Sequence, residues 1–319
     1  MGKITTIANG DGPHRPALVT GATGYIGFHL TQELLSSGRE VYAVVRSSSD
    51  ISRLQALSRP PGFLIYDGSM SGVTRIVEAV RPGAVFHLAS TVIVEHKPEQ
   101  LGELVAANVL FGTQLAEALA GICPEAPFIN TGTYLQHYDG DAYNPVNLYA
   151  ATKQAFEDIL LYFRQVRGLR VITLKLFGTY GPGDWRNKIL SLLIKNANSA
   201  GEVLKVSSGE QVIDLVHVSD VVRAYQAAET LAASGSVAGC FYAIDSGRRV
   251  SIRDLVSIFE SSTGMKLRVE WGARQRMREI LNPWHGERLP SWTAQISLEA
   301  GIKDTVEQER AMGLGASHS

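Results

Sequence analysis

A tyrosine and a lysine one helical turn apart are the side chains of this sequence best suited to proton transfer. Tyr149 and Lys153 stand four residues apart in a run with helical character, which places them on one face of a helix. An ammonium group beside a buried phenol favours the phenolate and lowers the pKa of the phenol. Tyr149 is therefore expected to exchange a proton with a substrate near neutral pH. Thr131, at the end of an upstream strand, could hydrogen-bond the same substrate oxygen. A tyrosine and a lysine four residues apart are also common on protein surfaces. Whether this pair is catalytic therefore depends on the elements that surround it.

Three glycines spaced three residues apart predict a site for a dinucleotide. They follow a short apolar strand at residues 17–19 and precede a helical pattern. Glycine permits the tight turn and lets a pyrophosphate approach the free N–H groups at the helix N-terminus. A second strand, residues 40–45, arrives where a dinucleotide-binding unit places the strand that meets the adenosine ribose. The expected cofactor contacts in this loop are Gly21, Thr23, Gly24, Tyr25, Ile26 and Gly27.

Strand and helix patterns alternate from residue 17 to about residue 174, which predicts an α/β fold. Further strands are expected at residues 63–66, 84–89, 128–131 and 171–176, with helices at 73–80, 101–120 and 149–166. This order predicts a Rossmann-type, doubly wound parallel sheet with ligands at the carboxyl ends of its strands.

From residue 178 onward the elements become shorter and the loops richer in glycine and proline, which predicts a second lobe. Residues 212–228 look like a return to the main sheet, and a helix is expected at 252–261. The expected division is a flexible N-terminus, a cofactor-binding domain, a smaller C-terminal α/β substrate lobe and a disordered tail. The flexible N-terminus is expected at residues 1–16 and the cofactor-binding domain at 17–177 plus about 211–240. The substrate lobe is expected at residues 178–210 plus about 241–310, and the disordered tail at 311–319.

Composition indicates a cytoplasmic protein. The 319 residues carry a formal charge of −1, which gives no long-range attraction to nucleic acid or to an anionic membrane. No signal peptide is expected, and the apolar runs look too short to cross a bilayer. With only Cys123 and Cys240, the chain shows no disulfide framework, which suits a reducing compartment.

Several motifs together make the chain resemble the extended short-chain dehydrogenases/reductases of the NAD-dependent epimerase/dehydratase family. The set is specific although no single member is. It comprises Gly21-x-x-Gly24-x-x-Gly27, Asp67-Gly68, His87-Leu88-Ala89-Ser90, Asn108-Val109-x-x-Gly112-Thr113, Tyr149-x-x-x-Lys153, Tyr180-Gly181-Pro182-Gly183 and Val216-His217-Val218-x-Asp220.

The resemblance implies roles for these residues. Tyr149 would be the acid/base, Lys153 would hold the nicotinamide ribose while tuning Tyr149, and Thr131 would orient the carbonyl. Thr133 is the weaker alternative to Thr131, because the family's hydroxyl sits directly at the strand end. His217 is expected to be structural. The other implied cofactor contacts are Asp67, Gly68, His87, Leu88, Ala89, Ser90 and Asn108, and the implied substrate contacts are Thr91, Thr133, Gly178 and Arg274.

The end of the second strand favours NADP(H) over NAD(H). An NAD site usually has an Asp or Glu there to bond the ribose 2′-OH, whereas this chain has Arg46 and Ser47 and no acid before Asp50. A guanidinium and hydroxyls suit a 2′-phosphate. Alternatively, Arg46 could stack on the adenine or point to solvent, so NAD(H) stays possible.

The residues around Thr131 and Tyr149 favour carbonyl reduction. By resemblance, the family's 4,6-dehydratases place Asp-Glu directly after the catalytic threonine, and no carboxylate follows Thr131 here. The run at residues 147–156 is similar to the 4-ketoreductases that make CDP- or dTDP-deoxyhexoses. The leading hypothesis is NADPH-dependent reduction of the 4-keto group of a nucleotide-linked 4-keto-6-deoxyhexose. The alternatives are an NAD-dependent nucleotide-sugar 4-epimerase, an NADPH-dependent reductase of a non-nucleotide carbonyl, and a non-enzymatic redox sensor.

Two departures bear on the substrate rather than on the hydride chemistry. Gly178 stands where the family commonly has Asn, and Ile213 stands where many members have an Arg that meets the nucleotide diphosphate. Arg274, Arg276 and Arg278 could supply diphosphate contacts or could be a solvated basic stretch. In relatives the helix around the Asn-Val motif and the helix from the catalytic tyrosine pair across a dimer interface, so a homodimer is expected.

Overall fold

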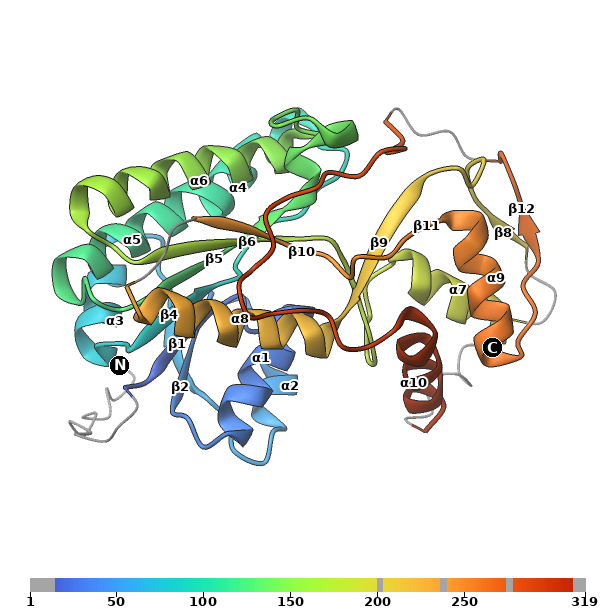
Figure 1. The fold of residues 1–319 in the computed structure, drawn as a ribbon. Helices are drawn as coiled ribbons and strands as arrows, with labels where there is room; N and C mark the ends of the chain where they lie inside the picture. The colour runs from blue at the N-terminus through green and yellow to red at the C-terminus, as the bar shows by residue number, and fades with distance from the viewer. Residues whose placement is uncertain (1–14, 200–202, 236–239, 274–277, 312–319) are drawn as a thin grey trace. The chain divides into compact units, whose positions relative to one another are not determined.

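The computed structural model describes residues 15–199, 203–235, 240–273 and 278–311, and its largest sheet has seven strands (Figure 1). The strand order is β10-β6-β5-β4-β1-β2-β3. The registers of β1 with β2 and β4, of β2 with β3, and of β4 with β5 are parallel. The strands are β1 (Ala17–Thr20), β2 (Val41–Val45), β3 (Gly62–Ile65), β4 (Ala84–His87), β5 (Phe128–Thr133), β6 (Val171–Leu176) and β10 (Phe241–Ile244). The predicted Rossmann-type α/β fold is confirmed.

Helices cover both faces of this sheet. α3, α5 and α6 lie side by side over one face, and α1 and the C-terminal part of α8 lie on the other (Figure 1). All residues of β1 and β4 are buried, as a strand covered on both faces requires. The helices are α1 (Tyr25–Ser36), α2 (Ser52–Gln55), α3 (Met70–Val80), α4 (Leu101–Val105), α5 (Phe111–Ile122), α6 (Leu148–Arg167) and α8 (Val218–Ala233).

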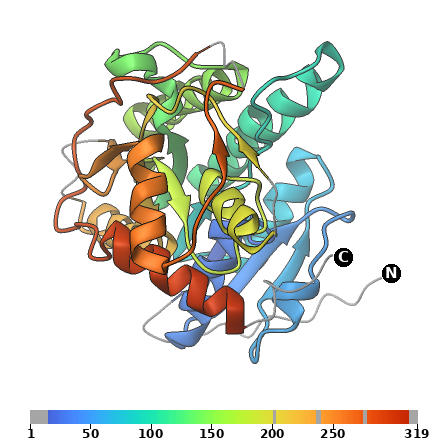
Figure 2. The ribbon, with the colours of Figure 1, turned by 90° about the vertical axis from the view of Figure 1, so that its right-hand side faces the viewer.

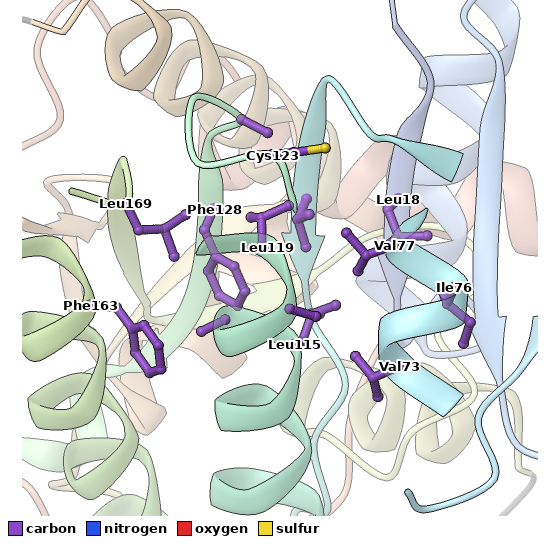
Figure 3. Close-up of a cluster of buried hydrophobic side chains, with 14 of the residues drawn as sticks. Leu18, Val73, Ile76, Val77, Leu115, Leu119, Cys123, Phe128, Phe163 and Leu169 are labelled. Carbon is purple, nitrogen blue, oxygen red and sulfur yellow. The ribbon is translucent and has the colours of Figure 1, made fainter. Parts of the chain in front are cut away.

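The core of this region joins strands to helices through closely packed apolar side chains. Figure 3 shows Phe128 of β5 between Leu119 of α5 and Phe163 of α6, with Val77 of α3 beside Leu18 of β1. Burial of one such side chain contributes about 1.5–3 kcal/mol. The orientation of α6, which carries Tyr149 and Lys153, is therefore fixed by the core.

The ends of α6 are set by its sequence. The Oδ1 atom of Asn147 accepts a hydrogen bond from the N–H of Ala150 at 2.9 Å, which caps the first turn. At the other end Gly168 has φ 71°, a left-handed conformation that glycine adopts without strain. The expected helix at 149–166 was thus correct to within one residue at each end.

The expected helix at 101–120 belongs to a longer segment, Pro98–Ile122, that contains a turn of π-helix at Ala106–Leu110. The segment has 25 residues and a hydropathy of 1.3, so by length and composition alone it could cross a membrane. The apolar stretches are therefore longer than the sequence suggested. One such helix is a weak indication, because Leu104, Phe111 and Leu115 are buried against neighbouring elements of the same unit.

The described residues divide into two compact units. The first comprises the residues up to Thr133, Asn147–Leu174 and Tyr225–Tyr242, and the second comprises Tyr134–Val146, Lys175–Ala224 and the residues from Ala243 onward. The second unit therefore takes residues 134–146 and 211–224, which the sequence had assigned to the cofactor-binding domain. The expected flexible N-terminus and disordered tail fall almost entirely outside the described residues.

A three-stranded sheet, β11-β9-β7, lies in the second unit. Its strands are β7 (Gly178–Tyr180), β9 (Val212–His217) and β11 (Arg249–Ser251). The prediction that residues 212–228 return to the main sheet is therefore wrong for β9, and the main sheet takes β10 instead. β9 pairs with β7 at Gly178, where a Cβ would stand 2.7 Å from the Leu215 side chain. Only a residue without a side chain lets β7 approach β9 this closely.

The remaining elements of the second unit are α7 (Ile189–Asn198), β8 (Leu204–Lys205), α9 (Ile252–Thr263), β12 (Val269–Glu270) and α10 (Leu298–Ala311). Figure 2 shows α9 and α10 packed against each other. The buried Asp220 ties the segment before α10 in place. Its carboxylate accepts hydrogen bonds from the N–H groups of Gln295 and Ile296 at 2.9 and 3.0 Å. The Val216-His217-Val218-x-Asp220 motif thus ends in a structural anchor.

Candidate active site and cofactor site

Three hydroxyl groups meet where the first turn of α6 passes the carboxyl end of β5. Tyr149 lies in the first turn of α6 and is hydrogen-bonded to the hydroxyls of Ser90 and Thr133. Lys153, one turn further along α6, is 1% exposed. The predicted Tyr149/Lys153 pair is thus buried in a polar cluster rather than displayed on the surface.

Burial controls the protonation of this pair. It raises the pKa of Tyr149 to about 12, against the opposing effect of the two hydroxyl hydrogen bonds. It lowers the pKa of Lys153 to about 8, against the opposing charge of Glu157. The expected lowering of the Tyr149 pKa is therefore not found. At neutral pH the phenol is protonated and the ammonium charged, which is the state needed to donate a proton to a carbonyl oxygen.

Thr131 does not lie at this cluster. Its hydroxyl donates to the carbonyl oxygen of His87 at 2.8 Å and lies 2.6 Å from the hydroxyl of the buried Tyr225. β5 continues two residues past the predicted strand end, and the hydroxyl bonded to Tyr149 is that of Thr133. The hydroxyl at the strand end is then that of Thr133, and Thr131 serves the interior of the sheet.

Asn108 joins the loop after β4 to α6. Its Oδ1 atom accepts hydrogen bonds from the Ser90 hydroxyl at 2.9 Å and from the N–H of Thr91 at 2.8 Å. Its amide nitrogen donates to the Thr91 carbonyl and to the Thr152 hydroxyl, both at 3.0 Å. All four hydrogen-bonding positions of the amide are used, so Asn108 has none left for a cofactor.

The π-turn at Ala106–Leu110 is what brings Asn108 into the bridging position, since such bulges re-aim a side chain inside a helix. Thr152 completes the connection, because its hydroxyl donates to the backbone carbonyl of Tyr149 at 2.7 Å. The sequence did not point to Thr152, whose place between Tyr149 and Lys153 carries no recognisable signal.

The glycine loop is shaped to admit a pyrophosphate. Gly21 has φ +72°, and a Cβ there would lie 2.6 Å from the backbone nitrogen of Ala89. Gly24 is the N-cap of α1 and offers no side chain to the free N–H groups of the first turn. An anion can take these hydrogen bonds and gains from the helix dipole.

A hydroxyl–imidazole pair fixes the loop that faces Gly21. The Thr20 hydroxyl lies 2.9 Å from Nδ1 of His87 and accepts the N–H of Ala89 at 3.1 Å. Burial, assisted by the charge of Lys153, lowers the pKa of His87 to about 3, so its imidazole is neutral at physiological pH. His87 therefore holds the Leu88-Ala89 backbone beside the glycine loop.

A nicotinamide dinucleotide fits these features. Among the described residues no hydrogen-bond acceptor reaches the buried Nζ of Lys153, which is thus an orphaned donor. An uncapped helix N-terminus and a side-chain-free turn stand at Gly21 and Gly24. Lys153 would hold a ribose hydroxyl, and the start of α1 would hold the pyrophosphate.

Four predicted contacts for the adenosine end lie just after two neighbouring strands, β2 and β3. Arg46 and Ser47 directly follow β2 and are exposed. Asp67 follows β3, and its carboxylate accepts hydrogen bonds from the N–H and hydroxyl of Ser69 and from Arg75. Gly68, next to it, has φ +87°.

The remaining predicted substrate residues are Thr91, Gly178 and Arg274. Thr91 is held by Asn108, and its hydroxyl lies 3.3 Å from Glu103. Gly178 begins β7 in the second unit, and Arg274 and Arg276 lie outside the described residues. Arg278 donates hydrogen bonds to the Asn144 side chain and to the Pro145 carbonyl, so it is not simply a solvated side chain.

Sequence reasoning missed a pocket in the second unit. It measures about 280 Å³ and is lined by Asp245, Gly247, Arg249, His285, Gly286 and Arg288. Arg249 donates to the Trp284 carbonyl at 2.7 Å, and Arg288 donates to Asp245 at 3.0 Å. His217 is buried in the same unit, edge-on to Tyr180, in keeping with its expected structural role.

Comparison with known proteins agrees with this arrangement. CDP-abequose synthase of Salmonella typhimurium is 28% identical over 303 residues, which cover 91% of this chain and 97% of that protein. A structure of MoeE5 in complex with UDP-glucuronic acid and NAD is 28% identical, with a TM-score of 0.76 over 93% of this chain and 99% of the other. A UDP-glucose-4-epimerase from Stenotrophomonas maltophila shares the fold, with a TM-score of 0.82, 22% identity and coverage of 95% and 100%.

The family assignment follows from the profile that matches residues 17–238, more than half of the chain. Its description is "NAD dependent epimerase/dehydratase family". The glycine loop, the buried Tyr149/Lys153 pair and the parallel sheet all lie within or beside the matched region. The chain belongs to this family, and it is an enzyme of the oxidoreductase type that uses a nicotinamide cofactor.

Proposed function

We propose that the protein reduces the 4-keto group of a nucleotide-linked 4-keto-6-deoxyhexose with NADPH. The observation that carries this proposal is a protonated, buried phenol at Tyr149, hydrogen-bonded to Thr133, with no carboxylate following that threonine. Tyr134 and Leu135 follow Thr133, so the acid and base needed to eliminate water are missing there. One relative is a CDP-abequose synthase, and MoeE5 was solved in complex with UDP-glucuronic acid, which supports a nucleotide sugar as the substrate class.

Each residue of the cluster has a role in this reaction. When bound, the reduced nicotinamide would supply the hydride that the ketone carbon accepts. Thr133 would orient the carbonyl oxygen, and Tyr149 would give it the phenolic proton, so that the C=O group becomes a secondary alcohol. The ammonium of Lys153 would then stabilise the phenolate until a proton returns from water. Asn108 and Thr152 are positioning residues that hold Ser90 and the start of α6 in register.

We assign the diphosphate of the substrate to the pocket of the second unit. Two guanidinium groups, Arg249 and Arg288, line it together with His285, and guanidinium is well suited to phosphate oxygens. In the β9–β11 ladder Arg249 is paired with Asp214, next to Ile213, which stands where many family members carry an arginine. Arg249 would thus replace that cation from the adjacent strand. This assignment supersedes the one based on Arg274.

The preference for NADPH rests on Arg46, the first residue after β2, and on the lack of an acid at that strand end. A nucleotide-sugar 4-epimerase is the second candidate, because MoeE5 was solved with NAD bound. Family epimerases keep their cofactor through the catalytic cycle, whereas a reductase consumes it.

An assay of cofactor consumption separates the two. Purified protein is mixed with CDP-, dTDP- and UDP-linked 4-keto-6-deoxyglucose in turn, with NADPH or NADH, and both the nucleotide oxidation and the sugar product are followed. We expect one NADPH oxidised for each keto sugar reduced, and a slower reaction with NADH. Interconversion of UDP-sugars by protein purified with bound NAD, without consumption of added NADPH, would instead establish the epimerase.

A homodimer is proposed as the working state. The helices of the first unit carry six apolar side chains that are 38–66% exposed in the single chain. They are Leu101, Val105, Leu110, Leu161, Tyr162 and Val166. Sedimentation equilibrium should give twice the chain mass, and Leu110→Glu should shift it toward the monomer. A wild-type monomer at micromolar concentration would refute the proposal.

A cytoplasmic location is proposed as well, since both cysteines are free thiols.

A further inference from the structure

The hydroxyl of Ser90 stands between the side chains of Tyr149 and Asn108. It donates its hydrogen to Oδ1 of Asn108 at 2.9 Å, and it is also hydrogen-bonded to the phenol of Tyr149. A hydroxyl carries one hydrogen and two lone pairs, so a hydrogen given to Asn108 is not available to Tyr149. In this arrangement Ser90 therefore accepts the phenolic hydrogen of Tyr149.

The backbone of Thr91 fixes the direction of these hydrogen bonds. The N–H of Thr91 donates to Oδ1 of Asn108 at 2.8 Å, and the amide nitrogen of Asn108 donates to the Thr91 carbonyl at 3.0 Å. These two backbone partners leave one orientation for the amide, with its oxygen toward Ser90. Because an amide oxygen carries no hydrogen, Ser90 must be the donor to Asn108. The donors thus run in order from Tyr149 to Ser90 to Asn108.

Loss of the phenolic proton would change what Ser90 faces. In the proposed reaction Tyr149 gives that proton to the carbonyl oxygen of the substrate, and the lone pairs of Ser90 would then meet those of a phenolate. Rotation about the Cβ–Oγ bond of Ser90 turns its hydrogen from Asn108 to the phenolate. Oδ1 of Asn108 keeps the N–H of Thr91, so this acceptor does not lose its last partner. The hydrogen bond gained is charge-assisted and is stronger than the neutral bond lost.

We propose that Ser90 stabilises the phenolate of Tyr149 by exchanging Asn108 for the phenolate oxygen as its hydrogen-bond acceptor. The inference rests on the proposed function, in which Tyr149 is the acid. It gives the phenolate a second hydroxyl donor besides Thr133. Tyr149 is 8% exposed, and a donor aimed at a charge that develops during the reaction acts most strongly where water is excluded. The Ser90 hydroxyl thereby acts on the atom that loses the proton.

The test compares Ser90→Ala, which removes the hydroxyl, with Ser90→Thr, which keeps it. Ser36→Ala is the matched control, because the Ser36 hydroxyl donates to the Glu33 carbonyl at 2.9 Å in the last turn of α1. Single-turnover oxidation of NADPH by the CDP-linked keto sugar is measured at pH 6.5, where the ammonium of Lys153 is charged. The Kd of NADPH, the half-saturating sugar concentration and the thermal melting of each variant are recorded as well.

Ser90→Ala should lower the single-turnover rate about 10- to 100-fold, the equivalent of one hydrogen bond to a charged group, while both binding constants change less than about threefold. Ser90→Thr should react within about threefold of the wild-type rate, and Ser36→Ala should match wild type. The role of Ser90 is refuted if Ser90→Ala reacts as fast as wild type, or if it weakens NADPH binding without loss of rate at saturation. A Ser90→Thr protein as slow as Ser90→Ala would also refute it, because the hydroxyl would then not be the cause.

Failure of the proposed function would give a different result. If wild type interconverts UDP-sugars and oxidises no NADPH, the reductase assignment fails, and the same three variants are compared in the epimerase reaction. Tyr149 would exchange a proton with the sugar oxygen there as well, so the same loss of rate is expected for Ser90→Ala. If Tyr149→Phe reacts as fast as wild type, the acid role of Tyr149 and the role of Ser90 fail together.

Discussion

Exchanging two threonines of one strand for valine should separate catalysis from stability. Thr133→Val removes the hydroxyl that bonds Tyr149 and, in the proposed reaction, the carbonyl oxygen. Loss of one oriented donor at a developing oxyanion costs about 2.7–4 kcal/mol of transition-state stabilisation, or a factor of about 10²–10³ in kcat. Valine has nearly the shape of threonine, so the fold and NADPH affinity should stay close to wild type.

Thr131→Val should lower stability and leave catalysis nearly unchanged. Its hydroxyl bonds the His87 carbonyl at 2.8 Å and the Tyr225 hydroxyl at 2.6 Å, and Tyr225 is fully buried. Leaving a buried hydroxyl without a partner costs about 1–3 kcal/mol of folding free energy. We therefore expect a lower denaturation midpoint in urea and, well below that midpoint, a kcat within about threefold of wild type.

Two measurements on both variants test this separation of catalysis from stability. NADPH oxidation is followed by stopped flow, and unfolding is followed in urea. The reasoning predicts a crossed result, in which the valine at 133 loses rate and the valine at 131 loses stability. It is refuted if Thr131→Val abolishes turnover while remaining folded and Thr133→Val turns over normally, because the strand-end hydroxyl would then be Thr131.

Three further substitutions test other parts of the structure. Burial raises the pKa of Asp214 from 3.8 to about 6, so its folding contribution is favourable at low pH and is lost as pH rises through 6. Asp214→Asn should therefore raise the unfolding free energy by about 1–3 kcal/mol at pH 8 and by about half as much at pH 5, as urea denaturation would record; an equal gain at both pH values would contradict the burial argument. Asp220→Ala should destabilise the protein by about 3–5 kcal/mol, because the backbone N–H groups of residues 295 and 296 lose their buried carboxylate acceptor. An unchanged melting curve would contradict the anchoring role of Asp220. Gly21→Ala should lower NADPH affinity at least about 10-fold in a fluorescence titration, since the added Cβ would lie 2.6 Å from the Ala89 nitrogen. A variant with wild-type affinity would show that this turn does not bind the dinucleotide.

Local patterns were enough to predict the sheet and the paired phenol and ammonium. Apolar strands buried on both faces and periodic helices are encoded residue by residue, so six of the seven strands, β1 to β6, followed from their order, whereas β10 did not. The cap at Asn147 and the glycine at 168 likewise mark α6 in the sequence. The spacing of Tyr149 and Lys153 on that helix was then geometrically determined.

What sequence could not supply depends on contacts between distant segments. The extension of β5 to Thr133, whose hydroxyl and not that of Thr131 is bonded to Tyr149, depends on neighbouring structure and not on local propensity. The close approach of β7 to β9 depends on the missing side chain at Gly178, which has no pattern of its own. The raised pKa of Tyr149 required knowledge of its burial, because the neighbouring ammonium alone suggested the opposite direction.

The pocket of Arg249 and Arg288 shows the same limit. Its two arginines are 39 residues apart in sequence and are brought together by the fold of the second unit. The sequence pointed to the arginine-rich stretch at 274–278 instead, because proximity along the chain was the only available guide.

The central claim is that Tyr149 donates the proton that completes ketone reduction. Its most direct test is the single-turnover rate of NADPH oxidation by wild type and Tyr149→Phe, with a CDP-linked 4-keto-6-deoxyhexose at saturating concentration. The account predicts that the variant binds NADPH with wild-type affinity and that its rate falls about 10²–10⁴-fold, the usual contribution of a positioned acid. A Tyr149→Phe protein that oxidises NADPH as fast as wild type would contradict it.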